Sequence, residues 1–184
     1  MKVSLILATL GRDRELADFL KSLMNQTDKN FELIIIDQNK DGKIDAIVDS
    51  FKSDLDLKHV KVDFTGNARA RDYGIGLAQG RIIAFPDDDC AYDRNVVKKV
   101  VAEFKRRPNL SILVAGSYEF SSNRFSIGVN SDNSQYFSRF KMMGVEFTQF
   151  FDLKKIDQKQ FHLDHDFGIG SKYSGAEGFE LLYR

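Results

Sequence analysis

The chain has 184 residues, 42% of them hydrophobic, which is most simply one domain with a substantial core. Its 27 Lys and Arg residues balance 27 Asp and Glu residues, so no global charge argues for nucleic acid or an anionic membrane surface as a partner. The single Cys excludes an internal disulfide framework and fits a reducing compartment.

Residues 3–9 are apolar and predict a buried strand. The charges at 12–14 end this run too soon for a signal peptide or a membrane span, so we expect a cytoplasmic protein. Peripheral association with the inner face of the membrane stays open. Helical spacing follows, with Asp13 as the expected N-cap and apolar residues at Leu16, Phe19, Leu20 and Leu23.

The next strand, 31–37, is apolar at its centre, which is typical of a parallel strand buried on both faces. In 59–64 apolar and polar residues alternate, so His59 is expected on a strand surface. The remaining predicted elements are helices over 44–51, 67–79 and from 96 to near Pro108, and strands over 82–85 and 110–115.

This alternation predicts an α/β fold with a mostly parallel central sheet flanked by helices. After about residue 120 the pattern degrades, and 147–151 is either a strand or an apolar patch facing a lid. No linker divides the chain, so we expect one domain over 1–184.

Three carboxylates, Asp87, Asp88 and Asp89, follow the predicted strand 82–85 directly after Pro86. Adjacent acids repel one another unless a cation neutralises them, and their hard oxygens suit Mg²⁺ or Mn²⁺. An isolated run of this kind is more often a solvated acidic turn. The choice between the two depends on the rest of the chain.

Asp37 and Asp63 also lie at the ends of predicted strands. Alone, each reads as a turn or cap residue, but parallel strands end along one edge of a sheet, which favours a common site. Arg69 and Arg71 lie in the first turns of the predicted helix after Gly66, where a phosphate or an Arg–Asp pair is expected.

Glu177 lies between glycines at an expected helix start, as a capping acid or as a general base facing a cleft. His162 and His165 lie among acids and form either a second metal-binding patch or, as we favour, a solvated loop.

Four segments, 3–12, 31–42, 66–90 and 167–184, together resemble the inverting glycosyltransferases of family 2, in that family's order. The resemblance implies the GT-A fold. It divides the domain into a Rossmann-like, nucleotide-sugar-binding half over 1–115 and a less regular, acceptor-binding half over 116–184.

The resemblance assigns donor-binding roles to three residues. Thr9 and Asp37 match positions that hold the nucleoside, and Arg71 matches the arginine that steadies the diphosphate. Asp63 and Asp88 are expected beside them in the donor site.

Asp87 and Asp89 match the two acids of the DXD motif, with Mn²⁺ or Mg²⁺ as the implied cofactor. Asp89 is expected to contact the metal, and Asp87 to lie near the ribose or the metal's waters. Glu177 matches the acid proposed as the base toward the acceptor hydroxyl, with Glu180 as the fallback.

The implied function is metal-dependent, inverting sugar transfer from a nucleoside-diphosphate sugar, with a UDP-sugar favoured, to a glycan or lipid-linked acceptor in bacterial surface polysaccharide synthesis. The alternatives are an inactive nucleotide-sugar-binding module and, ranked low, a metal-dependent phosphatase or nucleotidyltransferase. The chain departs from the family at Gln38-Asn39, at Asp72 and at Gly178, where a second acid often follows. It also stops at Arg184, where we expect either truncation or a fold that closes differently.

Overall fold

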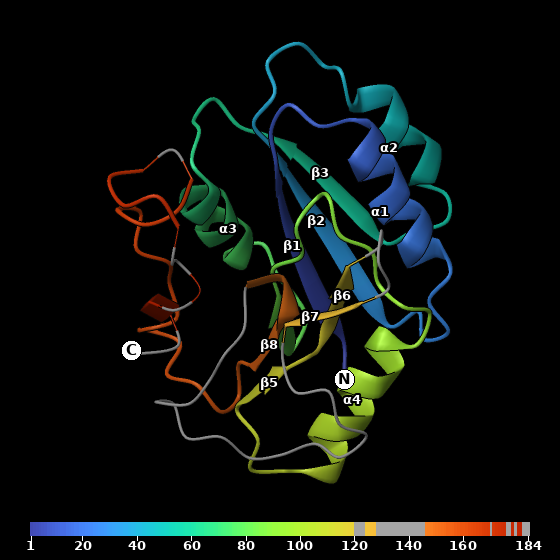
Figure 1. The fold of residues 1–184 in the computed structure, drawn as a ribbon, viewed down its shortest axis with the longest axis vertical. Coiled ribbons are helices and arrows are strands. Elements are labelled where there is room, and N and C mark those ends of the chain that lie inside the picture. The colour runs from blue at the N-terminus through green and yellow to red at the C-terminus, as the bar shows by residue number, and fades with distance from the viewer. Residues whose placement is uncertain (120–123, 128–145, 170, 176–177, 179, 182–184) are drawn as a thin grey trace.

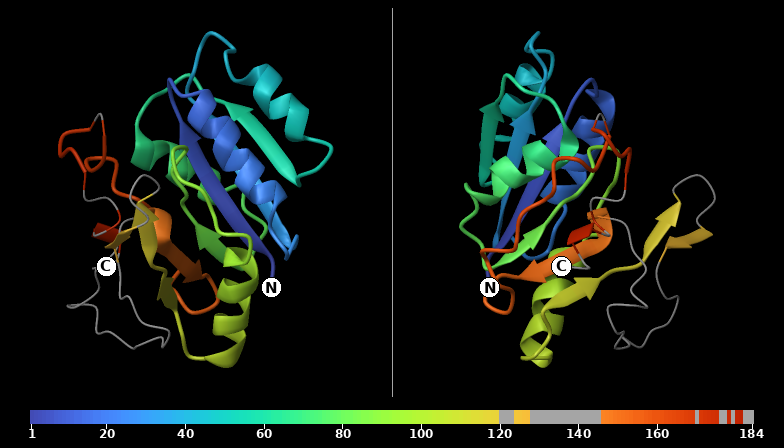
Figure 2. Two further views of the ribbon diagram at one scale, coloured as in Figure 1. Left: turned by 45° about the vertical axis from the view of Figure 1, so that its right-hand side comes forward. Right: turned by 90° about the vertical axis from the view of Figure 1, so that its left-hand side faces the viewer.

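The computed structural model describes the chain except residues 120–123, 128–145, 170, 176–177, 179 and 182–184. Six strands form the central sheet in the order β3-β2-β1-β4-β8-β5 (Figure 1). Their bounds are β1 Val3–Thr9, β2 Phe31–Asp37, β3 Leu57–Lys61, β4 Ile82–Ala84, β5 Ile112–Val114 and β8 Gln149–Asp152. The strands β6 Ser117–Glu119 and β7 Arg124–Ile127 form a separate hairpin that projects from this sheet (Figure 2).

Helices cover both faces of the central sheet. The core on one face includes α1 Arg14–Met24, α2 Asp45–Phe51 and α4 Val96–Arg106. The other core includes α3 Asn67–Ile75 and the chain near Phe161 and Leu163. Figure 1 shows α3 on the opposite side of the sheet from α1 and α2. None of the helices in the described part of the chain is long and apolar enough to cross a membrane.

The first half follows the sequence prediction closely. The first two strands have the predicted bounds, and the predicted apolar face of α1 is buried. Asp13 caps α1 by accepting a hydrogen bond from the Arg14 N–H at 2.6 Å. The third strand ends at Lys61 rather than Phe64, which leaves Asp63 in the following loop, and α3 ends at Ile75 rather than residue 79.

One strand breaks the expected order. The segment around 147–151, predicted to be either a strand or an apolar patch facing a lid, forms strand β8. This strand pairs antiparallel with both β4 and β5. Phe150 packs into one core and Phe151 into the other, so both faces of β8 need cover. Strand β8 finds this cover in the interior of the sheet, between β4 and β5. The fourth and fifth predicted strands, which are β4 and β5, are therefore not neighbours.

Candidate active site at the carboxyl edge of the sheet

The ends of β1 and β4 meet through Thr9 and the loop at 87–89. The Thr9 hydroxyl donates to Asp88 Oδ2 at 2.7 Å, and both side chains are buried. Arg12, which was not predicted as a site residue, donates to Asp88 Oδ1 at 3.1 Å and also pairs with Asp89. Burial raises the pKa of Asp88, while the Thr9 bond and the Arg12 charge oppose that rise. Asp88 therefore points inward and ties the two strand ends together.

Arg71 reaches the same loop from α3. Its guanidinium is 1% exposed and donates to Asp87 Oδ1 at 2.5 Å. The pKa of Asp87 is raised to about 6, because burial and the negative charges of Asp89, Glu146 and Asp88 together outweigh the lowering effect of Arg71. The site thus holds a buried cation beside a carboxylate that is crowded by other acids.

Asp87 and Asp89 offer the oxygens that a divalent ion needs. Their side chains are 36% and 49% exposed, whereas the Asp88 carboxylate between them is 11% exposed. The two outer carboxylates thus reach solvent, and a hard cation would relieve the repulsion that raises the pKa of Asp87. The residues fit Mn²⁺ or Mg²⁺, with Arg12 as a competing positive charge on Asp89.

Asp37 is fully buried, and both of its carboxylate oxygens are engaged. Oδ1 accepts from the Asn39 backbone N–H and side-chain amide, both at 2.8 Å. Oδ2 lies 2.9 Å from His59 Nε2. The prediction that His59 lies on a strand surface is wrong, because its side chain is 9% exposed and pairs with this acid. Asn39 Oδ1 in turn accepts from the Gly11 N–H at 2.7 Å. Asp37 therefore organises the wall between β1 and β2.

A second group of potential ligands lies beside that wall. Single ligand atoms of Asp37, Asp45 and His59 lie within 4.8 Å of one another. The Lys61 ammonium lies 2.5 Å from Asp45 Oδ2, so a positive charge already neutralises part of this group. It is distinct from the acids at 87–89.

The start of α3 is positioned by Gln38 and Gly66. Gly66 has a φ of 123°, and its N–H donates to Gln38 Oε1 at 2.7 Å, which joins the end of β2 to the helix start. Asp63, predicted at a strand end, is instead an exposed loop residue. It forms no hydrogen bond or ion pair within the described part of the chain. His165, from the loop favoured as solvated, lies 3.3 Å from Asp72 Oδ2 and is exposed.

Glu146 is an acid that the sequence analysis missed. It begins the short 3-10 helix η2 Glu146–Thr148. Its Oε1 accepts from the Gly178 N–H at 2.6 Å. No pattern could single it out, because it follows the segment in which the periodicity degrades. Glu177 lies outside the described residues, and Glu180 lies in a helical segment with Leu181, half-buried.

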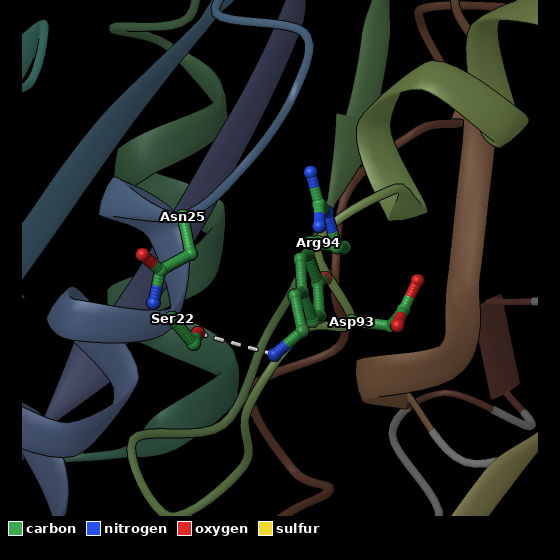
Figure 3. A pocket seen from close by; sticks show the side chains of 5 residues that line it. Ser22, Asn25, Asp93 and Arg94 are labelled. Carbon is green, nitrogen blue, oxygen red and sulfur yellow. Dashed lines mark hydrogen bonds between the residues drawn. The ribbon is translucent and has the colours of Figure 1, made fainter.

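Two pockets lie along α1. A cavity of about 550 Å³ is lined by Ser22 and Asn25 of α1 and by Tyr92, Asp93 and Arg94 before α4 (Figure 3). A second pocket, of about 400 Å³, is lined by Glu15, Asp18, Asp89, Cys90 and Ala91. Only the second pocket includes one of the three adjacent acids. Burial raises the pKa of the Cys90 thiol to about 12.

The fold and this edge define an α/β protein whose strand ends gather acids and an arginine, an arrangement suited to a metal and a diphosphate. A family model described as glycosyl transferase family 2 matches residues 4–170. The chain belongs to glycosyl transferase family 2, as the four segments had indicated.

The chain spans 60% or less of the length of three similar curated proteins. An uncharacterized glycosyltransferase of Haemophilus influenzae is 30% identical over 156 residues, which cover 78% of this chain and 60% of that protein. One of Rickettsia conorii is 33% identical over 53% of this chain and 16% of that protein. The Escherichia coli UDP-Glc:alpha-D-GlcNAc-diphosphoundecaprenol beta-1,3-glucosyltransferase WfgD is 28% identical over 68% of this chain and 49% of that protein.

Solved structures share the fold. Residues 1–349 of S. aureus TarS, in complex with UDP-GlcNAc, match with a TM-score of 0.75 at 18% identity, over 99% of this chain and 52% of that one. The mannosyltransferase PcManGT of Pyrobaculum calidifontis, in complex with GDP-Man and Mn²⁺, matches with a TM-score of 0.57 at 20% identity, over 65% of this chain and 36% of that one. The GT-A fold is thereby confirmed.

Proposed function

We propose that this chain carries out metal-dependent, inverting transfer of a sugar from a UDP-sugar to a lipid-linked or glycan acceptor, in the synthesis of a bacterial surface polysaccharide. The proposal rests on one observation: side chains that suit a metal and a diphosphate lie together at one edge of the sheet, namely Arg71, Asp87, Asp89 and Thr9. The work would take place at the inner face of the membrane, where a lipid-linked acceptor is available.

Each residue of this edge has a role in that reaction. Asp87 and Asp89 would hold Mn²⁺ or Mg²⁺, which supplies positive charge to the diphosphate leaving group. Arg71, fixed by its bond to Asp87, adds a second positive charge to the same group, and charge that grows during bond breaking is stabilised most in the transition state.

The nucleoside would occupy the edge beside β1 and β2. Thr9 and Asp37 lie opposite each other in register at the ends of these strands. Because Asp37 is fully buried and bonded to Asn39 and His59, it would hold the wall of the nucleoside pocket. Asp88 would keep the loop at 87–89 attached to this wall through Thr9.

Similar proteins support the donor, the metal and the acceptor. TarS has been solved with UDP-GlcNAc and PcManGT with GDP-Man and Mn²⁺. The name of WfgD specifies a UDP-sugar donor and a lipid-diphosphate acceptor. We extend these properties to the present chain as part of the proposal.

Thermal unfolding tests the donor and metal sites directly. UDP, GDP, dTDP and CDP are added with and without Mn²⁺ to the wild type, to Asp89→Ala and to Asp49→Ala, whose acid lies on the exposed face of α2. We expect Mn²⁺-dependent stabilisation by UDP of about 2.7 kcal/mol at 100 times its Kd. Asp89→Ala should lose this stabilisation and Asp49→Ala should keep it.

The outcomes separate the proposal from its rivals. Stabilisation by a different nucleotide would replace the proposed donor class. No stabilisation of the wild type by any of the four would contradict the proposed function. Binding without sugar transfer to an N-acetylglucosaminyl diphospholipid would favour the inactive binding module.

A further inference from the structure

Gly178 leaves a space that Glu146 fills. A Cβ built on Gly178 would lie 2.5 Å from Glu146 Cγ and 2.7 Å from its Cδ and Oε1. Cβ atoms in real proteins essentially never approach other atoms so closely. A side chain at position 178 and the Glu146 carboxyl group therefore cannot both occupy this space. The carboxyl group of Glu146 therefore stands where a side chain at position 178 would begin.

The topology delivers Glu146 to the edge of the sheet that holds the three acids. Strand β8 runs antiparallel to β4, with Ala84 opposite Phe150. The amino end of β8 therefore lies beside the carboxyl end of β4, and η2, which leads into β8, lies against β4.

We propose that Glu146 is a catalytic residue of this chain, the carboxylate that accepts the proton of the acceptor hydroxyl in the proposed sugar transfer. The inference rests on the proposed function and deepens it. The acceptor oxygen forms a bond to the anomeric carbon, the bond from that carbon to the diphosphate oxygen breaks, and the nucleoside diphosphate leaves with the electron pair. The acceptor proton moves to Glu146.

The hydrogen bonding of Glu146 suits this role. The Gly178 N–H holds Oε1 at 2.6 Å, which fixes the carboxyl group, while Oε2 accepts no hydrogen bond from the described part of the chain. The simpler role for the same contact is to cap the helical turn at Gly178. Glu146→Gln distinguishes the two roles, because the amide oxygen can still accept from Gly178 but the amide cannot take up a proton.

The first experiment measures release of UDP from UDP-glucose and UDP-N-acetylglucosamine, with an N-acetylglucosaminyl diphospholipid as acceptor. It compares the wild type, Glu146→Gln and the matched control Glu103→Gln, whose acid pairs with Arg106 and Arg107 at the carboxyl end of α4. General-base catalysis contributes about 10²–10⁴-fold, so we expect kcat of Glu146→Gln to fall at least about 100-fold. Its unfolding temperature and its stabilisation by UDP with Mn²⁺ should match the wild type, and the control should transfer normally.

Two failures are distinguishable. If the wild type transfers sugar and Glu146→Gln does so at a similar kcat, the role of Glu146 is overturned and the proposed function stands. If the wild type transfers no sugar from either donor, the proposed function fails and the role of Glu146 fails with it.

A second measurement tests the placement without any activity. Gly178→Ala is made in the wild type and in Glu146→Ala, and the two losses of stability are compared as a double-mutant cycle. We expect the substitution to destabilise the wild type more, because only there does the new Cβ meet a carboxylate. Equal losses in both backgrounds would overturn the proposal.

Discussion

The Arg71–Asp87 pair is buried unequally, with the guanidinium 1% exposed and the carboxylate 36% exposed. A buried charge is stable only when it is paired, so Arg71 depends on Asp87 more than Asp87 depends on Arg71. Burial nevertheless outweighs the attraction, since the pKa of Asp87 rises from 3.8 to about 6. The Asp87 carboxyl group therefore loses its proton at a higher pH than an ordinary aspartic acid does, close to neutral pH.

That raised pKa predicts how stability varies with pH in the metal-free protein. Between about pH 4 and 6 the unfolded chain ionises Asp87 while the folded chain keeps its proton, so stability from this group is present at low pH and is lost as pH rises toward 6. We expect Asp87→Asn to remove this part of the slope. The measurement is the unfolding temperature of both proteins from pH 4 to 8 with a chelator present, and identical slopes would contradict the assignment.

At the scale of elements, α3 matters because its close approach to the sheet carries Arg71 into the site. A Cβ on Gly74 would lie 2.3 Å from Ile6 Cγ2, so only glycine allows the helix to lie this near to β1. Ala68 and Ala70 in the same helix are buried and small, which suits the same contact. The position of the guanidinium thus depends on a glycine one helical turn away.

We expect Gly74→Ala to destabilise the protein by about 1–3 kcal/mol, the usual cost of overpacking a core. It should also weaken binding of UDP with Mn²⁺, because α3 must shift and Arg71 with it. Gly76→Ala is the control, since the nearest atom to its Cβ would be 3.5 Å away. Denaturant unfolding and titration with UDP measure the two effects, and equal behaviour of the two variants would refute the argument.

The elements of the first half could be predicted because each carries a local signal. The continuous apolar run of β2 and the helical spacing of α1 leave little choice, and both have the predicted positions. The third strand was misplaced because it is an edge strand with half-exposed side chains, so its alternation does not define its ends. The insertion of β8 depends on contacts between distant segments and has no local signal.

The candidate site divides in the same way. Thr9, Arg71 and the acids at 87–89 were predicted and lie together, because they follow strand ends or lie on α3. Asp63 does not join them. Arg12, His59 and Glu146 were missed, since a lone charged residue or histidine looks the same in sequence whether it is exposed or paired. Their functional roles, like those of Glu177 and Glu180, stay predictions.

At the scale of the whole molecule, the sheet separates two cores, and β8 contributes one large aromatic side chain to each. Phe151 is 1% exposed and its ring lies 5.2 Å from that of Phe161 and 6.1 Å from that of Phe85. Phe85 directly follows β4, and Phe161 lies in the chain after β8. Phe151 therefore holds the second half of the molecule against the first.

We expect Phe151→Ala to lower the free energy of unfolding by about 3–5 kcal/mol, because it removes a buried aromatic side chain and leaves a cavity in the core. Tyr118→Ala, at a position 58% exposed, should change it by about 0.5 kcal/mol or less. Urea denaturation gives both values, and a loss below about 1 kcal/mol for Phe151→Ala would show that β8 is not part of the cooperative core.

The half-buried thiol of Cys90 bears on which metal ions the acidic edge of the sheet can bind. Soft ions such as copper prefer thiolate to carboxylate and outcompete manganese and magnesium at most protein sites. Cys90 directly follows Asp89, but its pKa of about 12 keeps the sulfur protonated at neutral pH. A soft ion would have to expel that proton from a desolvated group. The sulfur beside the acidic edge is therefore a poorer ligand for a soft ion than an exposed thiol would be.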